Sequence, residues 1–366
     1  MKTAFNLNSK ELSCVLINLI TVKMFFSFPK TLVTNAGNAA WIQCIYVSLI
    51  AITLFLLTLK LYEKTDMKSI IELSDEIGGK VLKIIVGIAI ILIFTANVSV
   101  TVRSFPETVK NVLLPLSPME IILLLFAFSI ALASFGGFFS IARIHAIYIP
   151  IAGIMALVLL LLLTPYVKSV NIAPLFAKGT YNIFIKGIPS ISIFQDILIL
   201  YILLPFCKNY SATKKSATFS IIISSVFCTV IVLFYNLIYP NPAAQDFIFP
   251  IYQMTRLIKI GEFFQRLDAF FEFFWSISML LYSSFYLCII CYVFKKIFSL
   301  KDAKPLIVPF TIIITCISYI PSSIVEVLNA VTSVYMLTVP FSFLIPLIIA
   351  PIYSKKQNKL NKKRKL

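Results

Sequence analysis

The stretch VKMFFSFP, residues 22–29, interrupts an apolar segment that extends from residue 11 to residue 33. It places the charged Lys23 and the helix-breaking Pro29 inside a run long enough to cross a bilayer, which takes about 20 apolar residues. A second apolar segment, residues 187–207, opens with Gly187 and Pro189 and contains Asp196. Paired interruptions of this kind are typical of membrane proteins that bind a ligand where two helices are broken near the midplane.

The composition of the whole chain indicates a membrane protein. Of the 366 residues, 60% are hydrophobic and 13% are charged, and the mean hydropathy is +0.96. Soluble domains are about 45–50% apolar and about 25% charged, so soluble globular, coiled-coil and disordered classes are excluded. We expect an all-α polytopic membrane protein with ten transmembrane segments, at residues 11–33, 38–60, 80–102, 118–136, 143–165, 187–207, 216–239, 266–294, 305–323 and 330–353.

These segments form one integral membrane domain that covers residues 1–366. It is expected to have a short cytoplasmic N-terminus (1–10), a ten-helix core (11–353) and a basic cytoplasmic tail (354–366). Ten helices permit a five-plus-five inverted repeat, in which the first and sixth helices run in opposite directions and are often the broken ones.

The distribution of Lys and Arg predicts the orientation. With the N-terminus in the cytoplasm, 22 basic residues fall on the cytoplasmic side and 9 on the other, in agreement with the positive-inside rule. Both termini are therefore expected in the cytoplasm. Much of the net charge of +17 lies in the tail and between apolar runs, which predicts contact with anionic lipid headgroups and no nucleic-acid partner.

Two opposite charges are predicted at similar depth in the membrane. Lys23 lies about 13 residues into the first segment and Asp196 about nine residues into the sixth, or about 20 Å and about 13 Å of helix rise from opposite faces. A charge at that depth is costly unless it is paired or hydrated. Two interpretations remain open: separate polar residues that face a wet cavity, or an ion pair between the two broken helices.

Other polar side chains in the apolar segments are candidates to line one shared cavity. Each of them is also explained by ordinary hydrogen bonding between membrane helices. With the aromatic Phe26, the candidate ligand-binding residues are Lys23, Phe26, Ser27, Thr95, Ser99, Ser192, Gln195 and Asp196, and Asn97 lies beside them.

Motifs for enzymatic or metal chemistry are missing from the sequence. No Walker motif, Gly-x-Ser-x-Gly or His-Glu-x-x-His is present, so we expect no catalysis, no cofactor and no metal. Cys288 and Cys291 form a Cys-x-x-Cys in an apolar setting without histidine and are interpreted as core residues. His145, the single histidine, is expected at a solvated helix end near Arg143.

The segment between the seventh and eighth apolar runs resembles a known family. Its pattern matches that of the permease-like B subunit of bacterial spore germination receptors (GerAB/GerKB type), and the resemblance covers essentially the whole chain. Near the N-terminus, Phe28-Pro29 followed by Ala36-Gly37 and Trp41 resembles the first helical hairpin of that family. The matching positions of the later segment are Pro250, Tyr252, Arg256, Ile258, Ile260, Gly261, Arg266, Leu267 and Asp268, followed by Trp275 in the next helix.

This resemblance implies both a fold and a function. The family belongs to the amino acid–polyamine–cation transporter superfamily and has a LeuT-like fold of ten helices. It implies a germinant-binding subunit of the inner spore membrane, acting with an A subunit and a lipoprotein C subunit to trigger germination. The ligand would be a small nutrient, expected to be an amino acid, held between helices 1, 3, 6 and 8. The alternative is a secondary amino-acid transporter of the same fold.

One feature departs from the family pattern. Members often have small residues or Gly before the proline of the first helix, whereas residues 22–28 contain no Gly. Bulky side chains limit close approach of the backbone to a ligand carboxylate, so Lys23 is a candidate to supply the positive charge instead. In the later segment, Arg256, Gly261, Arg266 and Asp268 are candidates for a partner contact or a gate, although Asp268 also suits a helix start.

Overall fold

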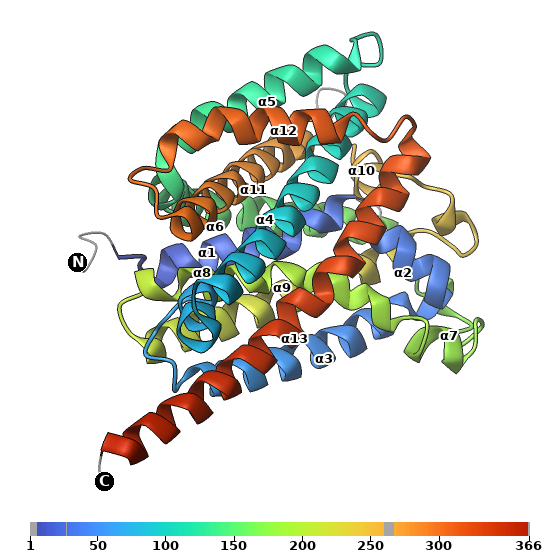
Figure 1. The fold of residues 1–366 in the computed structure, drawn as a ribbon. Helices are drawn as coiled ribbons and strands as arrows, with labels where there is room; N and C mark the ends of the chain where they lie inside the picture. Colours follow the sequence, from blue (N-terminus) through green and yellow to red (C-terminus); the bar gives the residue numbers. More distant parts are fainter. Residues whose placement is uncertain (1–5, 27, 260–266, 365–366) are drawn as a thin grey trace.

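The computed structural model describes residues 6–26, 28–259 and 267–364 (Figure 1). Their secondary structure is helical, apart from one isolated parallel bridge between Leu7 and Cys207. The α-helices are α1 (Ser9–Thr21), α2 (Phe28–Ala36), α3 (Ala40–Tyr62), α4 (Ile70–Val112), α5 (Met119–Phe135), α6 (Gly137–Leu163), α7 (Thr180–Phe184), α8 (Leu198–Leu203), α9 (Tyr210–Ile238), α10 (Pro250–Thr255), α11 (Leu267–Phe298), α12 (Ile307–Ser318) and α13 (Ile324–Arg364).

Short 3-10 helices join several of these elements. Within the described residues, seven helical stretches are long and apolar enough to cross a membrane, and Met119–Phe135 and Lys304–Ser318 are shorter apolar helices. Each of the ten expected segments overlaps helical structure. The 3-10 helices are η1 (Val22–Phe25), η2 (Gly37–Ala39), η3 (Thr164–Tyr166), η4 (Ser169–Ile172), η5 (Ile188–Ile197), η6 (Leu204–Phe206), η7 (Ala243–Gln245) and η8 (Lys304–Leu306).

Both expected interruptions are confirmed. The first segment consists of α1, then η1, and then α2 in a new direction, while the sixth consists of η5, α8 and η6. Pro189 lies in the first turn of η5, and its missing N–H disfavours a regular α-helix there. Gly187 precedes it, where an added Cβ would lie 2.3 Å from the carbonyl oxygen of Ile183. Close backbone packing therefore requires glycine at this position.

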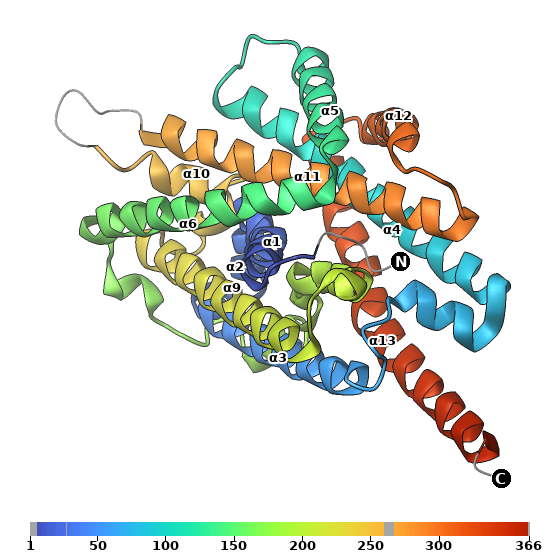
Figure 2. The same cartoon turned by 90° about the vertical axis from the view of Figure 1, so that its left-hand side faces the viewer.

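The interrupted segments occupy the centre of the bundle. η5 and α8 are almost completely buried, and η5 packs against α1, α3 and α13. α6 exposes most of its apolar side chains, as expected for a helix that faces lipid. α5 and α12 lie side by side at one edge of the bundle in both views (Figures 1 and 2).

Side-chain caps fix the starts of two helices on the expected cytoplasmic side. Asn8 and Glu11 form a capping box at α1, and Ser69 and Glu72 form another at α4. Such boxes satisfy backbone N–H groups that have no partner within the helix. Gly79 has φ 65° and ψ −160° and divides α4 into a short first part and a long second part.

Loops that were predicted to share a side of the membrane contact one another. On the expected cytoplasmic side, the Lys356 ammonium donates to the carbonyl of Glu76 at 2.7 Å, and the N–H of Leu7 donates to the carbonyl of Phe206 at 2.8 Å. On the expected outer side, the amide of Asn236 donates to the carbonyl of Gly37 at 3.0 Å, and the Lys178 ammonium donates to Thr34 O at 2.7 Å. The start of α1 and the end of α13 lie toward one end of the bundle (Figure 1).

Candidate functional site

An ion pair joins the two interrupted segments at the centre of the bundle. The Nζ atom of Lys23 in η1 lies 2.6 Å from Oδ2 of Asp196 in η5, and their side chains are 2% and 0% exposed. Of the two interpretations that the sequence left open, the ion pair is therefore confirmed. Because each charge compensates the other, both can occupy an apolar interior that would strongly disfavour either one alone.

Aromatic side chains surround this pair. The hydroxyl of Tyr286 in α11 donates a hydrogen bond to Oδ1 of Asp196. The ring of Tyr282 packs 4.8 Å from that of Tyr286, and the Tyr335 ring of α13 lies 5.1 Å from the Lys23 ammonium, within the range of a cation–π contact. These tyrosines were not among the expected site residues, because each lies in an apolar run with no nearby charge in the chain to mark it.

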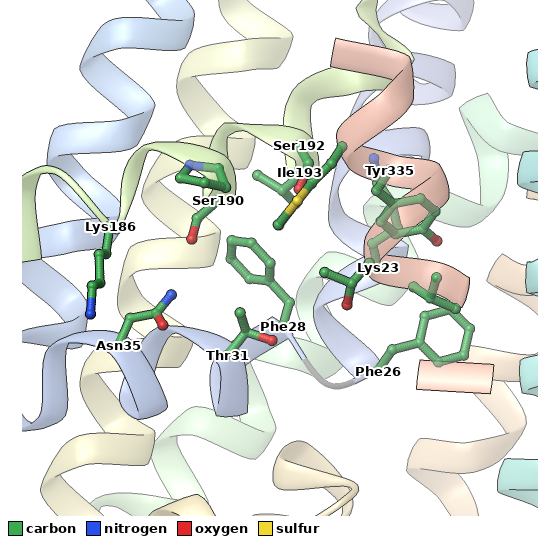
Figure 3. A pocket seen from close by; sticks show the side chains of 14 residues that line it. Lys23, Phe26, Phe28, Thr31, Asn35, Lys186, Ser190, Ser192, Ile193 and Tyr335 are labelled. Carbon is green, nitrogen blue, oxygen red and sulfur yellow. The ribbon is translucent and has the colours of Figure 1, made fainter. Parts of the chain in front are cut away.

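A cavity of about 400 Å³ lies beside the ion pair (Figure 3). Its wall is formed by the break between η1 and α2, by the start of η5, and by one turn of α13 around Tyr335. Lys23 and Tyr335 lie at one end, and Lys186 and Asn35 lie at the other, with Phe28 between them (Figure 3). The cavity therefore has a lysine side chain at each end, with the aromatic ring of Phe28 between them.

The candidate ligand-binding residues divide into three groups. Lys23, Phe26 and Ser192 line the cavity. Asp196 and Gln195 are buried behind it, and the Gln195 amide donates to Oδ1 of Asn97 at 2.9 Å. Thr95 and Ser99 lie in α4, where the Ser99 hydroxyl donates a hydrogen bond to the Thr95 carbonyl at 2.8 Å. Ser27 lies outside the described residues.

The helices around the cavity differ from those that the family resemblance implied. The lining residues come from the first and sixth segments as expected, but the third wall belongs to α13, through Val331, Thr332 and Tyr335. The third and eighth segments, α4 and α11, contact the ion pair from behind, through the edge-on packing of Phe94 and Tyr286 at 4.8 Å. The polar lining residues Thr31, Asn35 and Lys186 were missed because they lie near segment ends, where polar residues are ordinary.

The segment with the family pattern, on the expected outer side, lines a separate polar cavity of about 570 Å³, called the outer cavity below, together with the end of α4. Arg256 and Asp268 both line it, and the Tyr252 hydroxyl donates to Oδ2 of Asp268 at 3.3 Å. The Arg256 guanidinium lies 5.8 Å from the centre of the Tyr252 ring. Gly261 and Arg266, the other two candidates in this segment, lie outside the described residues.

His145 is not at a solvated helix end, and that expectation was wrong. It is 0% exposed in α6, where Nδ1 lies 2.8 Å from the Ile141 carbonyl and Nε2 lies 3.1 Å from Nδ2 of Asn18 in α1. α6 begins at Gly137, earlier than the expected segment at 143, so His145 lies two turns inside the helix. It contributes to packing between α1 and α6.

The described residues contain no group of three or more His, Cys, Asp or Glu side chains that could hold a metal ion. Cys288 and Cys291 are both buried as free thiols in α11, and the Cys288 thiol lies 3.4 Å from the carbonyl oxygen of Ser134. Their interpretation as core residues agrees with these contacts.

The broken helices and the central cavity define the class of this protein, a transporter-like helical membrane protein. Two crystal structures of a manganese transporter from Eremococcus coleocola share the fold. One is a point mutant, with TM-score 0.53 and 12% identity over 92% of this chain and 78% of that one. The other is a complex with an aromatic bis-isothiourea substituted compound, with TM-score 0.53 and 11% identity over 93% and 78%.

The sequence comparisons identify the family. The family model described as spore germination protein, the spore permease family, matches residues 6–327, so the chain belongs to this family. Three proteins of Bacillus subtilis (strain 168) are similar to it: spore germination protein B2 (24% identical over 68% of both chains), putative spore germination protein YfkT (23% over 90% of both) and spore germination protein A2 (22% over 76% of both).

Proposed function

We propose that this chain is the nutrient-sensing membrane subunit of a germinant receptor, with the cavity beside Lys23 as its ligand site. The observation that supports it is the position of that cavity between the two interrupted segments, with a buried ammonium in its wall. A ligand carboxylate would contact Lys23, which replaces the close backbone approach that glycines allow elsewhere in the family. An amino acid fits about 400 Å³ with room for an apolar side chain against Phe26 and Phe28.

The proposed receptor includes further features of fold and assembly. We propose ten membrane-spanning segments in a five-plus-five inverted repeat, with both termini in the cytoplasm and the protein in the inner spore membrane. The contacts among loops of the same expected side support this arrangement. The proposed partners are an A subunit and a lipoprotein C subunit. The outer segment around Arg256 and Asp268 is the proposed partner contact or gate, and the tail meets anionic lipid.

Deletion of the gene in the native spore-former tests the receptor function. Spores of the deletion strain, and of the same strain with the gene restored, are exposed to single nutrients: the twenty L-amino acids, several sugars and several nucleosides. We expect the response to at least one nutrient to disappear in the deletion strain and to return on restoration. An unchanged response to every nutrient would contradict the proposal.

A secondary amino-acid transporter is the second candidate, favoured by the likeness of the fold to a manganese transporter. The described lining of the cavity includes two lysines and no Asp or Glu, which disfavours a metal cation as cargo, because such cations are bound by carboxylate and other oxygen ligands. Uptake of radiolabelled amino acids into vesicles that contain the purified protein separates the two functions. A sensor binds without accumulating label, whereas a transporter accumulates it.

A further inference from the structure

We propose that the Lys23–Asp196 ion pair holds the two interrupted segments together and is broken when a small carboxylate ligand binds. We call the pair, in this role, a ligand-displaced tie. On entering the cavity, the carboxylate takes the Lys23 ammonium from Asp196 and so releases η1 from η5. The inference rests on the proposed function, because it concerns how the same cavity recognises its nutrient and what binding sets off.

Access to the pair is one-sided. Lys23 is among the residues that line the cavity, whereas Asp196, whose Oδ2 is only 2.6 Å from the Lys23 ammonium, is not. A ligand in the cavity therefore reaches the Lys23 side chain before the Asp196 carboxylate, and the ammonium, which is covered while it is paired, must turn toward the cavity to meet the ligand. An anionic group can compete with Asp196 for Lys23, but a cationic group cannot compete with Lys23 for Asp196 without first moving the lysine aside.

The charge of the cavity selects anions. Among the described residues that line it, two are lysines, Lys23 and Lys186, and none is Asp or Glu. Lys186 is exposed at the opposite end from Lys23 (Figure 3). Because Asp196 compensates Lys23 in the paired state, the net positive charge of the described lining comes from Lys186, and low-dielectric walls such as Phe28 and Ile193 strengthen its attraction for anions. The described lining thus favours a ligand with a small anionic group, such as a carboxylate, that can reach Lys23.

Asp196 keeps a partner when Lys23 leaves. Its Oδ1 atom accepts a hydrogen bond from Tyr286, on the other side of the carboxylate from Lys23. A hydrogen bond donated to a charged acceptor contributes more stabilising free energy than a hydrogen bond between neutral groups. The ion pair can therefore break while Asp196 keeps one hydrogen-bond partner, provided that the ligand carboxylate compensates the charge of the Lys23 ammonium.

Release of Lys23 would be transmitted to α11. Phe25 and Phe26 follow Lys23 in the chain, and their rings pack edge-on against Phe271 at 5.2 Å and Trp275 at 5.5 Å, both in α11. A movement of Lys23 toward the cavity shifts these rings against the outer half of α11. That half begins beside the polar outer cavity, so ligand binding at the centre reaches the outer face through direct contacts.

The first experiment compares carboxylates with amides on spores that carry the wild-type chain. Each L-amino acid that triggers the response is tested beside its carboxamide, which has the same shape without the negative charge. We expect the carboxamide to require at least tenfold more for a half-maximal response. A wild-type chain that responds equally to both, or only to neutral nutrients such as sugars, would overturn the proposal.

The second experiment exchanges the two charges, Lys23→Asp with Asp196→Lys. The swapped chain keeps an ion pair, so a purely structural pair predicts a normal response. Displacement by a carboxylate instead predicts that the protein accumulates in the membrane but no longer responds to L-amino acids at tenfold the wild-type concentration. A wild-type response by the swapped chain would overturn the proposal.

Two milder variants test the idea even if the swapped chain fails to accumulate. Tyr286→Phe leaves the ion pair in place but removes the second partner of Asp196, and should raise the half-maximal concentration about tenfold. Lys186→Met, at an exposed position, should raise it severalfold. The matched control is Tyr353→Phe, a buried tyrosine far from the cavity that bonds Lys68 at 2.9 Å. Unchanged responses in both test variants would refute the displacement.

These outcomes are distinguishable from failure of the proposed function. If deletion of the gene abolishes a nutrient response but the Tyr286 and Lys186 variants behave as wild type, the receptor function stands and the displaced tie is wrong. If deletion changes no nutrient response, the proposed function itself is wrong, and with it the inference that rests on it.

Discussion

Lys23 and Asp196 can both be buried in the membrane interior because each compensates the charge of the other. Both side chains are fully buried, and the surrounding residues of α1, α8 and α11 are mainly apolar. Removal of one partner from a buried pair leaves an uncompensated charge, whereas removal of both leaves a neutral site. This difference between single and double changes is a property of the pair and can be measured without knowledge of the ligand.

We therefore expect Lys23→Met and Asp196→Asn each to destabilise the protein by about 3–5 kcal/mol, and the double variant to recover most of that loss. Immunoblots of membrane fractions report the accumulated protein. The control is the Lys68–Glu76 pair at the expected cytoplasmic end of the bundle, which is about one-third exposed. Neutralisation of that pair should cost at most about 1 kcal/mol. Additive losses in the double variant at 23 and 196 would contradict the expectation.

Asp268 offers a prediction at the outer face. It lies in the first turn of α11, lines the outer cavity, and accepts a hydrogen bond from Tyr252. Asp268→Asn preserves shape and hydrogen-bond capacity but removes the charge, so the protein should accumulate while germination slows severalfold. Glu120→Gln, an exposed carboxylate in the first turn of α5, should have no effect. If germination and protein level fall together, Asp268 serves stability alone.

At the scale of elements, the interrupted sixth segment depends on close backbone packing. A Cβ at Gly187 would lie 2.3 Å from the backbone oxygen of Ile183 and 2.6 Å from Nε2 of Gln43, whose amide also donates to Ser190 at 3.2 Å. A backbone atom cannot rotate away as a side chain can, so any substitution must displace the start of η5. That displacement would reach Ser190, which lines the cavity.

Gly187→Ala should therefore lower stability by about 1–3 kcal/mol, the usual cost of overpacking. The matched control is Gly153→Ala in α6, where an added Cβ would meet nothing within 4 Å and where alanine is the better helix former. Thermal unfolding of both variants in detergent provides the comparison. Equal unfolding temperatures for the two would show that η5 adapts without cost.

The sequence predicted elements better than it predicted contacts. Each of the ten expected apolar runs overlaps helical structure, although only seven helical stretches of the described residues are long and apolar enough to cross a membrane. The breakers at Pro29, Gly187 and Pro189 located both interruptions, because these residues act on the backbone locally. The Lys23–Asp196 pair could be predicted because unpaired charges at that depth are so costly. The part played by Tyr335 could not, since nothing local to residue 335 indicates that α13 turns that face toward the first helix. His145 was misplaced because the start of α6 was set six residues too late.

At the scale of the whole molecule, the two ends of the bundle can be assigned to the two sides of the membrane by labelling. With exposed Cys316 and partly exposed Cys207 replaced by serine, the five buried cysteines remain. One new cysteine at a time is then introduced at Val170, Asp302 or Lys355, all exposed positions. We expect a membrane-impermeant maleimide to label position 170 in intact protoplasts and to label 302 and 355 only after lysis. Labelling of position 355 in intact protoplasts would overturn the ten-segment topology.

α13 has a mechanical consequence, because one element both walls the cavity and extends past the bundle (Figure 1). Tyr335 and Gln357 are separated by about 33 Å along this helix at 1.5 Å per residue. A tilt of about 5° at the cavity would therefore swing the far end by about 3 Å. Pro340, Pro346 and Pro351 lie between these points and weaken the helix where they interrupt its hydrogen bonds. The bending stiffness of α13 at these three prolines therefore determines how much of a movement at the cavity reaches the far end of the helix.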